Sequence, residues 1–392
     1  YTLGYQYWYI LESFLACNQM SQKNPVRTKL TEHSPLAELQ AALAIAQKKN
    51  ETAKYRIIGL TLETRPDAIS PKTIFHMRQQ GCTRVELGLQ APDDAILTLI
   101  QRGHTVQQFR DAMQLLRYAG FKVDLHFMPD LPGTTPDHDV EMYQEIFSDP
   151  GLKPDMIKIY PNTVIKSAEL YQWFLDGRYV PYGDTPAMSE ALMKMKLATP
   201  RYCRISRLIR DIPATEIEGG NTVTNLREFL EKKLHAQGLK CVCLRCREIS
   251  RQVKNLPADT EPQLFIDEYD TTGGTEYFIT FEDPNRIAVF GFLRLRLPTT
   301  PVPETLIKQL PVLKDTAFIR ELHVYGRLVG IGKHENNASQ HTGLGKKLVA
   351  AAEKIAREHG FKSTTVISGV GVRDYYRHLG YRSKDTYVTK KI

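Results

Sequence analysis

The most constraining feature of this sequence is the alternation of strand-like and helical stretches through its first half. The strand-like runs cover residues 56–67, 83–90, 122–128 and 156–160, and the helical stretches cover residues 36–49, 71–80, 105–119, 136–148, 167–177 and 186–198. Repeated strand–helix units favour parallel strands joined by right-handed crossovers. The sequence therefore predicts an α/β protein whose first domain, residues 1–198, is an open or closed β/α barrel.

Polar side chains stand where several of the predicted strands end. The candidates are Glu63, Arg65, Asp67, Gln90 and Asp130. Chemistry in β/α barrels collects at the carboxyl ends of the strands. Each residue taken alone is better explained as a cap of the following helix. As a set, they indicate a binding site at this edge of the sheet.

A run of arginines follows the last predicted helix of this domain. Arg201, Arg204, Arg207 and Arg210 recur at every third position, with Tyr202 among them. A solvated surface is the simpler interpretation, but arginines near an aromatic ring also suit contacts to an RNA backbone. The chain has 52 Lys and Arg against 44 Asp and Glu, and the resulting charge of +8 favours polyanionic partners. We expect this segment to bind an RNA backbone.

Three of the six cysteines, Cys241, Cys243 and Cys246, fall within six residues. This spacing predicts a metal site, and structural zinc takes four ligands, for which His235 and Cys203 are candidates. An iron–sulfur cluster is the alternative. We assign residues 199–261 to a basic, cysteine-bearing bridge and linker.

The sequence also predicts where the protein resides. It contains neither a signal peptide nor an apolar run of membrane-spanning length. Clustered, unpaired cysteines suit a reducing compartment. We therefore expect a cytoplasmic protein without membrane association.

A glycine-rich turn opens a strongly helical segment near the end of the chain. The turn contains Gln340, His341, Gly343, Leu344 and Gly345. Glycines allow close approach to the backbone, and a helix N-terminus offers free N–H donors, so the turn fits a pyrophosphate. A simple capped turn is the alternative.

Predicted strands surround this helix, at residues 288–295, 318–324 and 363–368. A short helix with Tyr375 and Tyr376 follows, and it would place phenol groups at the mouth of the same crevice. This order of elements resembles the GNAT acetyltransferases. The resemblance implies that residues 262–392 form a GNAT-like domain and that the glycine-rich turn binds acetyl-coenzyme A.

Four motifs of the first domain resemble the partial barrel of radical S-adenosylmethionine enzymes. They are Glu63-Thr64-Arg65-Pro66, Gly88-Leu89-Gln90, Arg102-Gly103-His104 and Leu131-Pro132-Gly133. The resemblance implies that Glu63, Gln90, Arg102 and Asp130 face S-adenosylmethionine. It also implies a 4Fe-4S cluster held by three cysteines, but only Cys17 precedes Glu63. We expect the cluster ligands to lie outside the given sequence; loss of the cluster is the alternative.

A partial radical barrel joined through a basic segment to a GNAT-like domain resembles the catalytic subunit of Elongator, in a single-chain bacterial or archaeal form. The resemblance implies addition of a carboxymethyl group to C5 of the tRNA wobble uridine, in the anticodon stem-loop, with acetyl-CoA as the carbon source. It implies that Tyr375 and Tyr376 are catalytic. Two alternatives are a protein lysine acetyltransferase with a scaffolding barrel and a tRNA-binding module that has lost its cluster.

Overall fold

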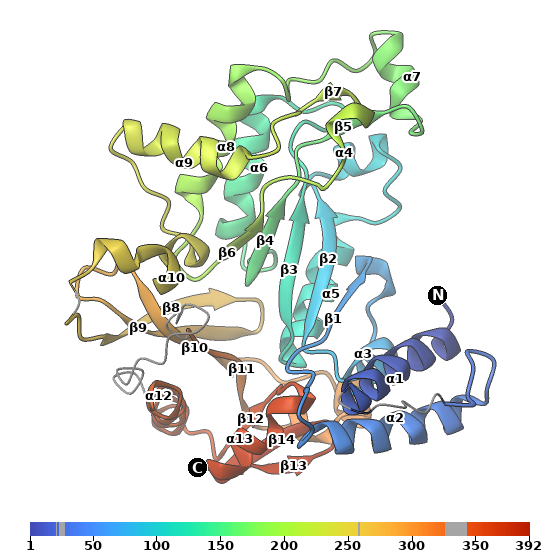
Figure 1. Cartoon of the computed structure of the whole chain (residues 1–392), viewed down its shortest axis with the longest axis vertical. Helices are drawn as coiled ribbons and strands as arrows, with labels where there is room; N and C mark the ends of the chain where they lie inside the picture. The colour runs from blue at the N-terminus through green and yellow to red at the C-terminus, as the bar shows by residue number, and fades with distance from the viewer. Residues whose placement is uncertain (21, 23–27, 258, 326–342) are drawn as a thin grey trace.

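The computed structural model describes residues 1–20, 22, 28–257, 259–325 and 343–392. The described chain is built around two main sheets, one parallel and one mostly antiparallel (Figure 1). This architecture confirms the predicted α/β class, with an open sheet of parallel strands followed by a second, mostly antiparallel sheet.

The first sheet has five parallel strands in the order β1-β2-β3-β4-β6. They are β1 (Thr61–Thr64), β2 (Arg84–Gln90), β3 (Lys122–Phe127), β4 (Met156–Ile159) and β6 (Arg204–Arg207). The intervening helices are α3 (Pro71–Gln79), α4 (Asp94–Leu99), α5 (Val106–Tyr118), α6 (Pro136–Ser148), α7 (Leu170–Leu175) and α8 (Pro186–Ala198). In the described chain this sheet stays open, with β1 and β6 as its edges.

Local sequence explains where these helices begin. Helix α6 has Pro136 at its first position, where no backbone N–H is needed, and Thr135 accepts a hydrogen bond from the His138 N–H at 3.2 Å. In α5, Thr105 and Gln108 cap the first turn reciprocally. Both helices therefore start within one residue of their predicted positions.

Two predicted boundaries differ from the structure. The barrel sheet continues past residue 198, because β6 pairs with β4 and buries Ile205 completely. The predicted buried strand at residues 56–67 is also shorter, since only Thr61–Thr64 pair with β2. The Ile57 carbonyl instead accepts a hydrogen bond from the Gly371 N–H at 2.9 Å. The backbone before β1 is therefore bonded to a distant part of the chain and not to β2.

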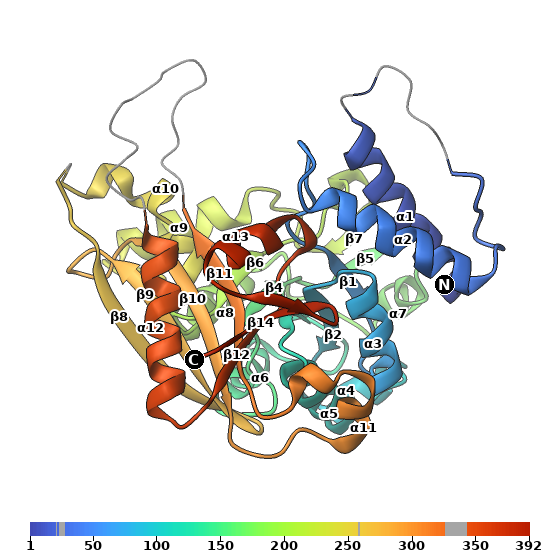
Figure 2. The ribbon, with the colours of Figure 1, turned by 90° about the horizontal axis from the view of Figure 1, so that it is seen from below.

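Two long helices, α1 (Leu3–Gln19) and α2 (Leu36–Asn50), form a layer beside the first sheet. Their apolar faces share a buried cluster that includes Tyr7, Phe14 and Leu39. Val370, from near the other end of the chain, is buried in the same cluster. We call α1 and α2 the N-terminal layer; it packs against the C-terminal domain as well as the barrel (Figure 2).

The bridge between the two domains contains short elements. They are β7 (Ile217–Gly220), α9 (Leu226–Ala236), α10 (Ile249–Gln252), and the 3-10 turns η2 (Ala214–Glu216), η3 (Leu244–Arg247) and η4 (Val253–Asn255). Strand β7 pairs with β5 (Thr163–Ile165) of the first domain. A further 3-10 turn, η1 (Pro66–Ala68), follows β1.

The second sheet has the order β13-β14-β12-β11-β10-β9-β8. Its strands are β8 (Gln263–Thr271), β9 (Gly274–Glu282), β10 (Val289–Pro298), β11 (Ala317–Val324), β12 (Ser363–Val366), β13 (Arg382–Lys384) and β14 (Tyr387–Lys391). The helices and turns are α11 (Glu304–Gln309), η5 (Pro311–Leu313), α12 (Leu344–Glu358), η7 (Val370–Val372) and α13 (Arg373–His378). All three strands predicted for this domain are present.

A buried network of charges joins the second sheet to the amino ends of the barrel strands. Arg320 of β11 donates to Asp155, just before β4, at 2.9 Å and to the Phe121 carbonyl, just before β3, at 2.8 Å. Arg117 of α5 donates to Glu276 of β9 at 2.9 Å. Because these groups are shielded from water, they fix the two domains relative to each other. Every helix in the described residues is too short or too polar to cross a membrane.

Candidate functional site

A cavity of about 690 Å³ opens at the carboxyl ends of the barrel strands. Glu63, Gln90, His126, Tyr160 and Arg207, at or next to the ends of five adjacent strands, all line it. The second sheet docks on the opposite, amino ends. The cavity therefore lies where parallel sheets bind their ligands, within the usual size range for a cofactor site.

Three of the four residues predicted to face S-adenosylmethionine line this cavity: Glu63, Gln90 and Arg102. Gln90 has a φ of 73°, a left-handed conformation unusual for a residue with a side chain. A Cβ atom at Gly88 would stand 2.5 Å from an Arg102 guanidinium nitrogen, so only glycine leaves room for this arginine. The local backbone is thus shaped around the polar groups.

Asp130, the fourth predicted residue, is buried and is not among the residues lining the cavity. It accepts a hydrogen bond from the Tyr182 N–H at 3.0 Å. Its other carboxylate oxygen is buried without a hydrogen-bond partner. Burial, with the nearby Asp139 carboxylate, raises the pKa of Asp130 to about 7. In this structure Asp130 therefore supports the wall behind the cavity.

Sequence reasoning missed a cluster on the cavity floor. His126 lies 3.2 Å from a Glu86 carboxylate oxygen and 3.9 Å from a Glu63 oxygen, and Lys158 also contacts Glu86. Hydrogen bonds from His126 and Lys158 lower the pKa of Glu86 to about 2. A usable signal was present, because polar residues share one face of these strands at positions 86 and 90, 124 and 126, and 158 and 160.

The structure divides the four predicted RNA-binding arginines into two pairs. Arg207 and Arg210 line the cavity, and Arg210 lies over the Tyr160 ring at 5.9 Å. Arg201 instead donates to Glu282 at 2.9 Å, and Arg204 donates to Glu248 at 2.8 Å. The predicted continuous basic face is therefore interrupted, since Arg201 and Arg204 are engaged in partly buried ion pairs. Arg207 also pairs, with Asp211, but both of these side chains are exposed.

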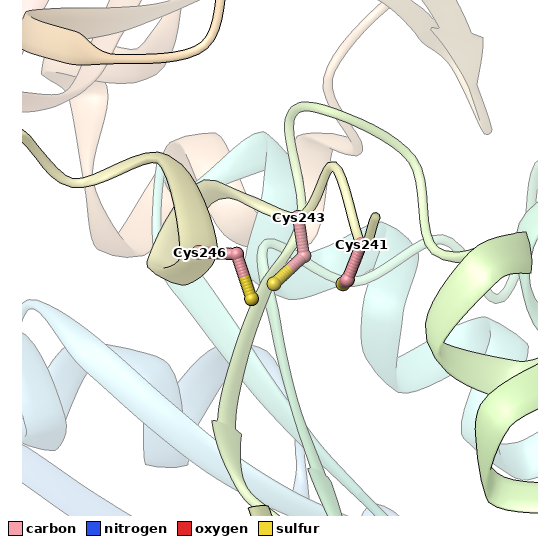
Figure 3. Close-up of side chains that lie close together, drawn as sticks. All are labelled: Cys241, Cys243 and Cys246. Carbon is pink, nitrogen blue, oxygen red and sulfur yellow. The ribbon is translucent and has the colours of Figure 1, made fainter. Parts of the chain in front are cut away.

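The three predicted metal-binding cysteines converge, as Figure 3 shows. Their sulfur atoms lie within 4.8 Å of one another. Hydrogen bonds from Cys241 and Cys246 lower the pKa of Cys243, which favours the thiolate that metals bind. The donor set therefore fits a thiophilic metal centre.

The cysteine cluster lies at the amino end of β6, since the Leu244 N–H donates to the Cys203 carbonyl at 2.9 Å. Of the two predicted fourth ligands, Cys203 is buried and His235 is exposed, and neither joins the described group of three. The described residues that line the cavity, at the carboxyl ends, include no cysteine, so they supply no ligand for an iron–sulfur cluster there.

The second sheet opens into a wedge between β11 and β12. These parallel strands pair only as far as Ile319 and Val366, although β11 continues to Val324. Arg320 is an extra residue in the pairing of β11 with β10, which bends the strand at this point. The backbone of β11 beyond the bulge is therefore available to a ligand on the β12 side.

Helix α12 begins at the open end of this wedge. Gly343 caps it with a φ of 98°, and Leu344 and Gly345 form its first turn. A Cβ atom at Gly345 would stand 2.5 Å from the Tyr375 hydroxyl, so the predicted cradle and one predicted catalytic tyrosine are neighbours. Gln340 and His341, also predicted for the cradle, lie outside the described residues.

The two predicted catalytic tyrosines line a cleft of about 400 Å³ beside this helix. Tyr375 is 41% exposed, whereas Tyr376 is 5% exposed and packs in the core of the second sheet. Arg56, which precedes β1, lines the same cleft. The cleft is thus built by both domains.

Comparison with known proteins agrees with this geometry. The model of the Radical SAM superfamily matches residues 29–146, and that of the Radical SAM C-terminal domain matches residues 154–236. A tRNA uridine(34) acetyltransferase of Dehalococcoides mccartyi is 42% identical over 90% of this chain and 75% of its own length. The chain belongs to this tRNA uridine(34) acetyltransferase family. It is accordingly an enzyme related to proteins that act on tRNA.

Other relatives of the tRNA uridine(34) acetyltransferase family extend the comparison. The Methanocaldococcus infernus member is 39% identical over 100% of this chain and 69% of its own length. Elongator complex protein 3 of Drosophila melanogaster is 38% identical over 90% of this chain and 63% of its own. The solved structure of Methanocaldococcus infernus Elp3 with an N-terminal deletion superposes with a TM-score of 0.87, covering 100% of this chain and 87% of that chain.

Proposed function

We propose that this enzyme adds a carboxymethyl group to C5 of the wobble uridine of tRNA, using acetyl-CoA as the carbon source. The observation that carries the proposal is the presence of two ligand sites in one chain, the cavity at the barrel strand ends and the cleft at the start of α12. A simple acetyltransferase would need only the second site.

The cavity is proposed to hold S-adenosylmethionine, which in this family of folds supplies a radical when it is cleaved. Glu63 offers a carboxylate to the ammonium group of the methionine part, and Arg102 offers a guanidinium to its carboxylate. The side-chain amide of Gln90 can accept or donate a hydrogen bond at the same wall of the cavity. Asp130 would contribute by holding the backbone of Tyr182 in place.

Acetyl-CoA is proposed to bind along the wedge between β11 and β12. The unpaired N–H groups at the start of the 15-residue helix α12 suit its pyrophosphate, with Gly343, Leu344 and Gly345 allowing close approach. Gln340 and His341 are proposed as coenzyme-binding residues from the sequence pattern alone. Tyr375 and Tyr376 would then flank the acetyl end, where a phenol can donate a hydrogen bond to the thioester oxygen.

The anticodon stem-loop of tRNA is the proposed partner of the cavity rim. Arg207 and Arg210 face the cavity and are positioned to contact phosphates next to the target base. Arg201 and Arg204 are proposed to act indirectly, since their ion pairs with Glu282 and Glu248 fix the segment that carries the other two.

A protein lysine acetyltransferase is the second candidate, and Glu321 argues against it. Such an enzyme needs a general base near the thioester, and Glu321 is the acidic residue of β11, the strand that borders the wedge. Burial would weaken the acidity of Glu321, but the charges of Lys122 and Arg294 outweigh this effect and lower its pKa. Glu321 also accepts a hydrogen bond from Arg294 at 2.9 Å, so it is a poor proton acceptor.

The three cysteines are proposed to bind structural zinc. Three thiolates within 4.8 Å suit either zinc or iron–sulfur. Zinc is favoured because the cluster ties η3 to the amino end of β6, far along the strand from the cavity. In purified protein, Cys243→Ser should lose stoichiometric zinc while Cys17→Ser retains it; iron in place of zinc would reject the assignment.

The test of the main proposal is thioester hydrolysis of acetyl-CoA with and without tRNA. We expect tRNA to stimulate hydrolysis, and a tRNA with cytidine at the wobble position to yield no modified base by mass spectrometry. Tyr375→Phe should lower the stimulated rate. Acetylation of added peptides together with indifference to tRNA would instead support the lysine acetyltransferase.

A further inference from the structure

Helix α13, which carries both tyrosines, is attached to the N-terminal layer through Glu51. This residue follows the last turn of α2. Its carboxylate lies 3.3 Å from the Arg373 guanidinium and also contacts Arg377. The two arginines flank Tyr375 and Tyr376 in the sequence, so one carboxylate holds both ends of the tyrosine-bearing segment.

Glu51 is well placed to make this contact strong. It is only 3% exposed. Burial alone would raise its pKa, but hydrogen bonds from Arg377 and Lys48 and the charges of Arg377 and Arg373 outweigh burial and lower the pKa. A shielded carboxylate between two guanidinium groups is a charge-assisted contact that resists rearrangement.

The tyrosine helix depends on such external contacts. With six residues, α13 is far shorter than a helix that is stable by itself. The preceding turn is also held by the barrel side, because the Gly371 N–H donates to the Ile57 carbonyl at 2.9 Å and Val370 is buried among α1 and α2. The position of α13 is thus set by residues 51–58 and the N-terminal layer as much as by its own domain.

We propose that Glu51 is a positioning residue for the acetyl end of the cleft, and that it acts by fixing the placement of Tyr375 through Arg373 and Arg377. This inference rests on the proposed function of the tyrosine pair. Tolerance for movement is small, because Tyr375 stands directly against Gly345 at the start of α12. A shift of α13 would therefore change the distance between the phenol and the cradle.

The experiment compares Glu51→Gln with Lys48→Met in the full chain. Glutamine keeps the shape of Glu51 but removes the charge that holds both arginines. Lys48 also pairs with Glu51, at 3.1 Å, but it is exposed and does not contact α13, so its replacement is a matched control. Amide hydrogen exchange of residues 369–381 is measured first, followed by kcat and KM for tRNA-stimulated hydrolysis of acetyl-CoA.

We expect Glu51→Gln to speed exchange in residues 369–381 at least fivefold and to lower kcat about tenfold with a smaller change in KM. Lys48→Met should leave both the exchange rate of residues 369–381 and kcat unchanged. Unchanged exchange in Glu51→Gln would overturn the inference, as would a kcat that falls equally in both variants.

The two readouts separate this inference from the proposed function. If the unaltered chain shows no response to tRNA, the proposed function fails. Exchange in residues 369–381 would still report whether Glu51 holds the tyrosine helix.

Discussion

Arg320 and Asp155 form a fully buried ion pair between the two domains, with a guanidinium nitrogen 2.9 Å from a carboxylate oxygen. Arg294 and Arg117 lie within 4.0 Å of the same carboxylate. Desolvation opposes such a cluster, so its stability depends on every charge having a counter-charge. Asp155 is the acidic residue on the barrel side that satisfies this requirement.

Replacing Asp155 by Ala should lower the free energy of unfolding by about 3–5 kcal/mol, because it leaves buried arginines uncompensated. Urea unfolding measures this change, and Asp155→Asn provides a milder variant if the alanine form does not accumulate. The exposed Glu228, paired with Lys232 at 2.8 Å, is the control, and its replacement by Ala should leave stability nearly unchanged. Equal effects at both positions would contradict the interpretation.

Replacing Arg210 by Ala should weaken tRNA binding several-fold and reduce the slope of log affinity against log salt concentration by about one. Arg207→Ala should behave similarly. Arg204→Ala should leave the salt slope unchanged and instead reduce stability, since Glu248 loses a partner 2.8 Å away. Titrations at several salt concentrations test all three variants. If only Arg204→Ala changed the salt slope, the assignment of phosphate contacts to Arg207 and Arg210 would be wrong.

Gly345→Ala should weaken acetyl-CoA binding with little effect on folding, because the new methyl group would stand 2.5 Å from the Tyr375 hydroxyl and displace that flexible ring. In a Tyr375→Phe background the hydroxyl is gone, so the added effect of Gly345→Ala should shrink. Calorimetric titration of acetyl-CoA into the four proteins of this cycle measures the coupling. Gly59→Ala, where a Cβ atom has 3.9 Å of space, is the control. Strict additivity would mean that the two residues act independently.

Stability should depend on pH through Asp130. Burial raises the pKa of its carboxyl from 3.8 to about 7 in the folded protein. A raised pKa means that this contribution is fully present below about pH 4 and is lost as pH rises through 7, by up to about 1.4 kcal/mol per pH unit. Asp130→Asn keeps the oxygen that accepts from the Tyr182 N–H and should flatten the dependence.

Unfolding free energies between pH 4.5 and 8 test this expectation. Asp139, whose pKa burial raises to about 6, adds a similar slope at lower pH and will remain in the variant. Asp137→Asn, on the exposed first turn of α6, is the control. An unchanged slope in Asp130→Asn would show that this carboxyl ionises normally.

Local sequence patterns predicted much of the fold. Helix α6 was predicted at residues 136–148, and the structure places it there, with Thr135 and Pro136 at its start. The convergence of Cys241, Cys243 and Cys246 was also predicted, since six residues cannot separate them far. Features encoded within one turn or one strand can be read from sequence because their causes are local.

Features that depend on distant partners could not be predicted in the same way. Arg320 and Arg294 read as ordinary charged strand residues, yet both are buried because Asp155 lies opposite them. Asp130 was predicted to face the cavity, but a hydrogen bond from Tyr182, 52 residues away, holds it in the wall. Only the tertiary structure decides which partner a polar side chain meets.

The burial of Val370 in the N-terminal layer has a consequence for biosynthesis. Helices α1 and α2 are synthesised well before residue 370, so their shared core lacks one member until that residue has been made. Glu51 likewise lacks its ion-pair partners until Arg373 and Arg377 have been synthesised. The packing of α1 and α2 therefore stays incomplete during synthesis of the two sheets, until the segment around residues 370–377 has been made.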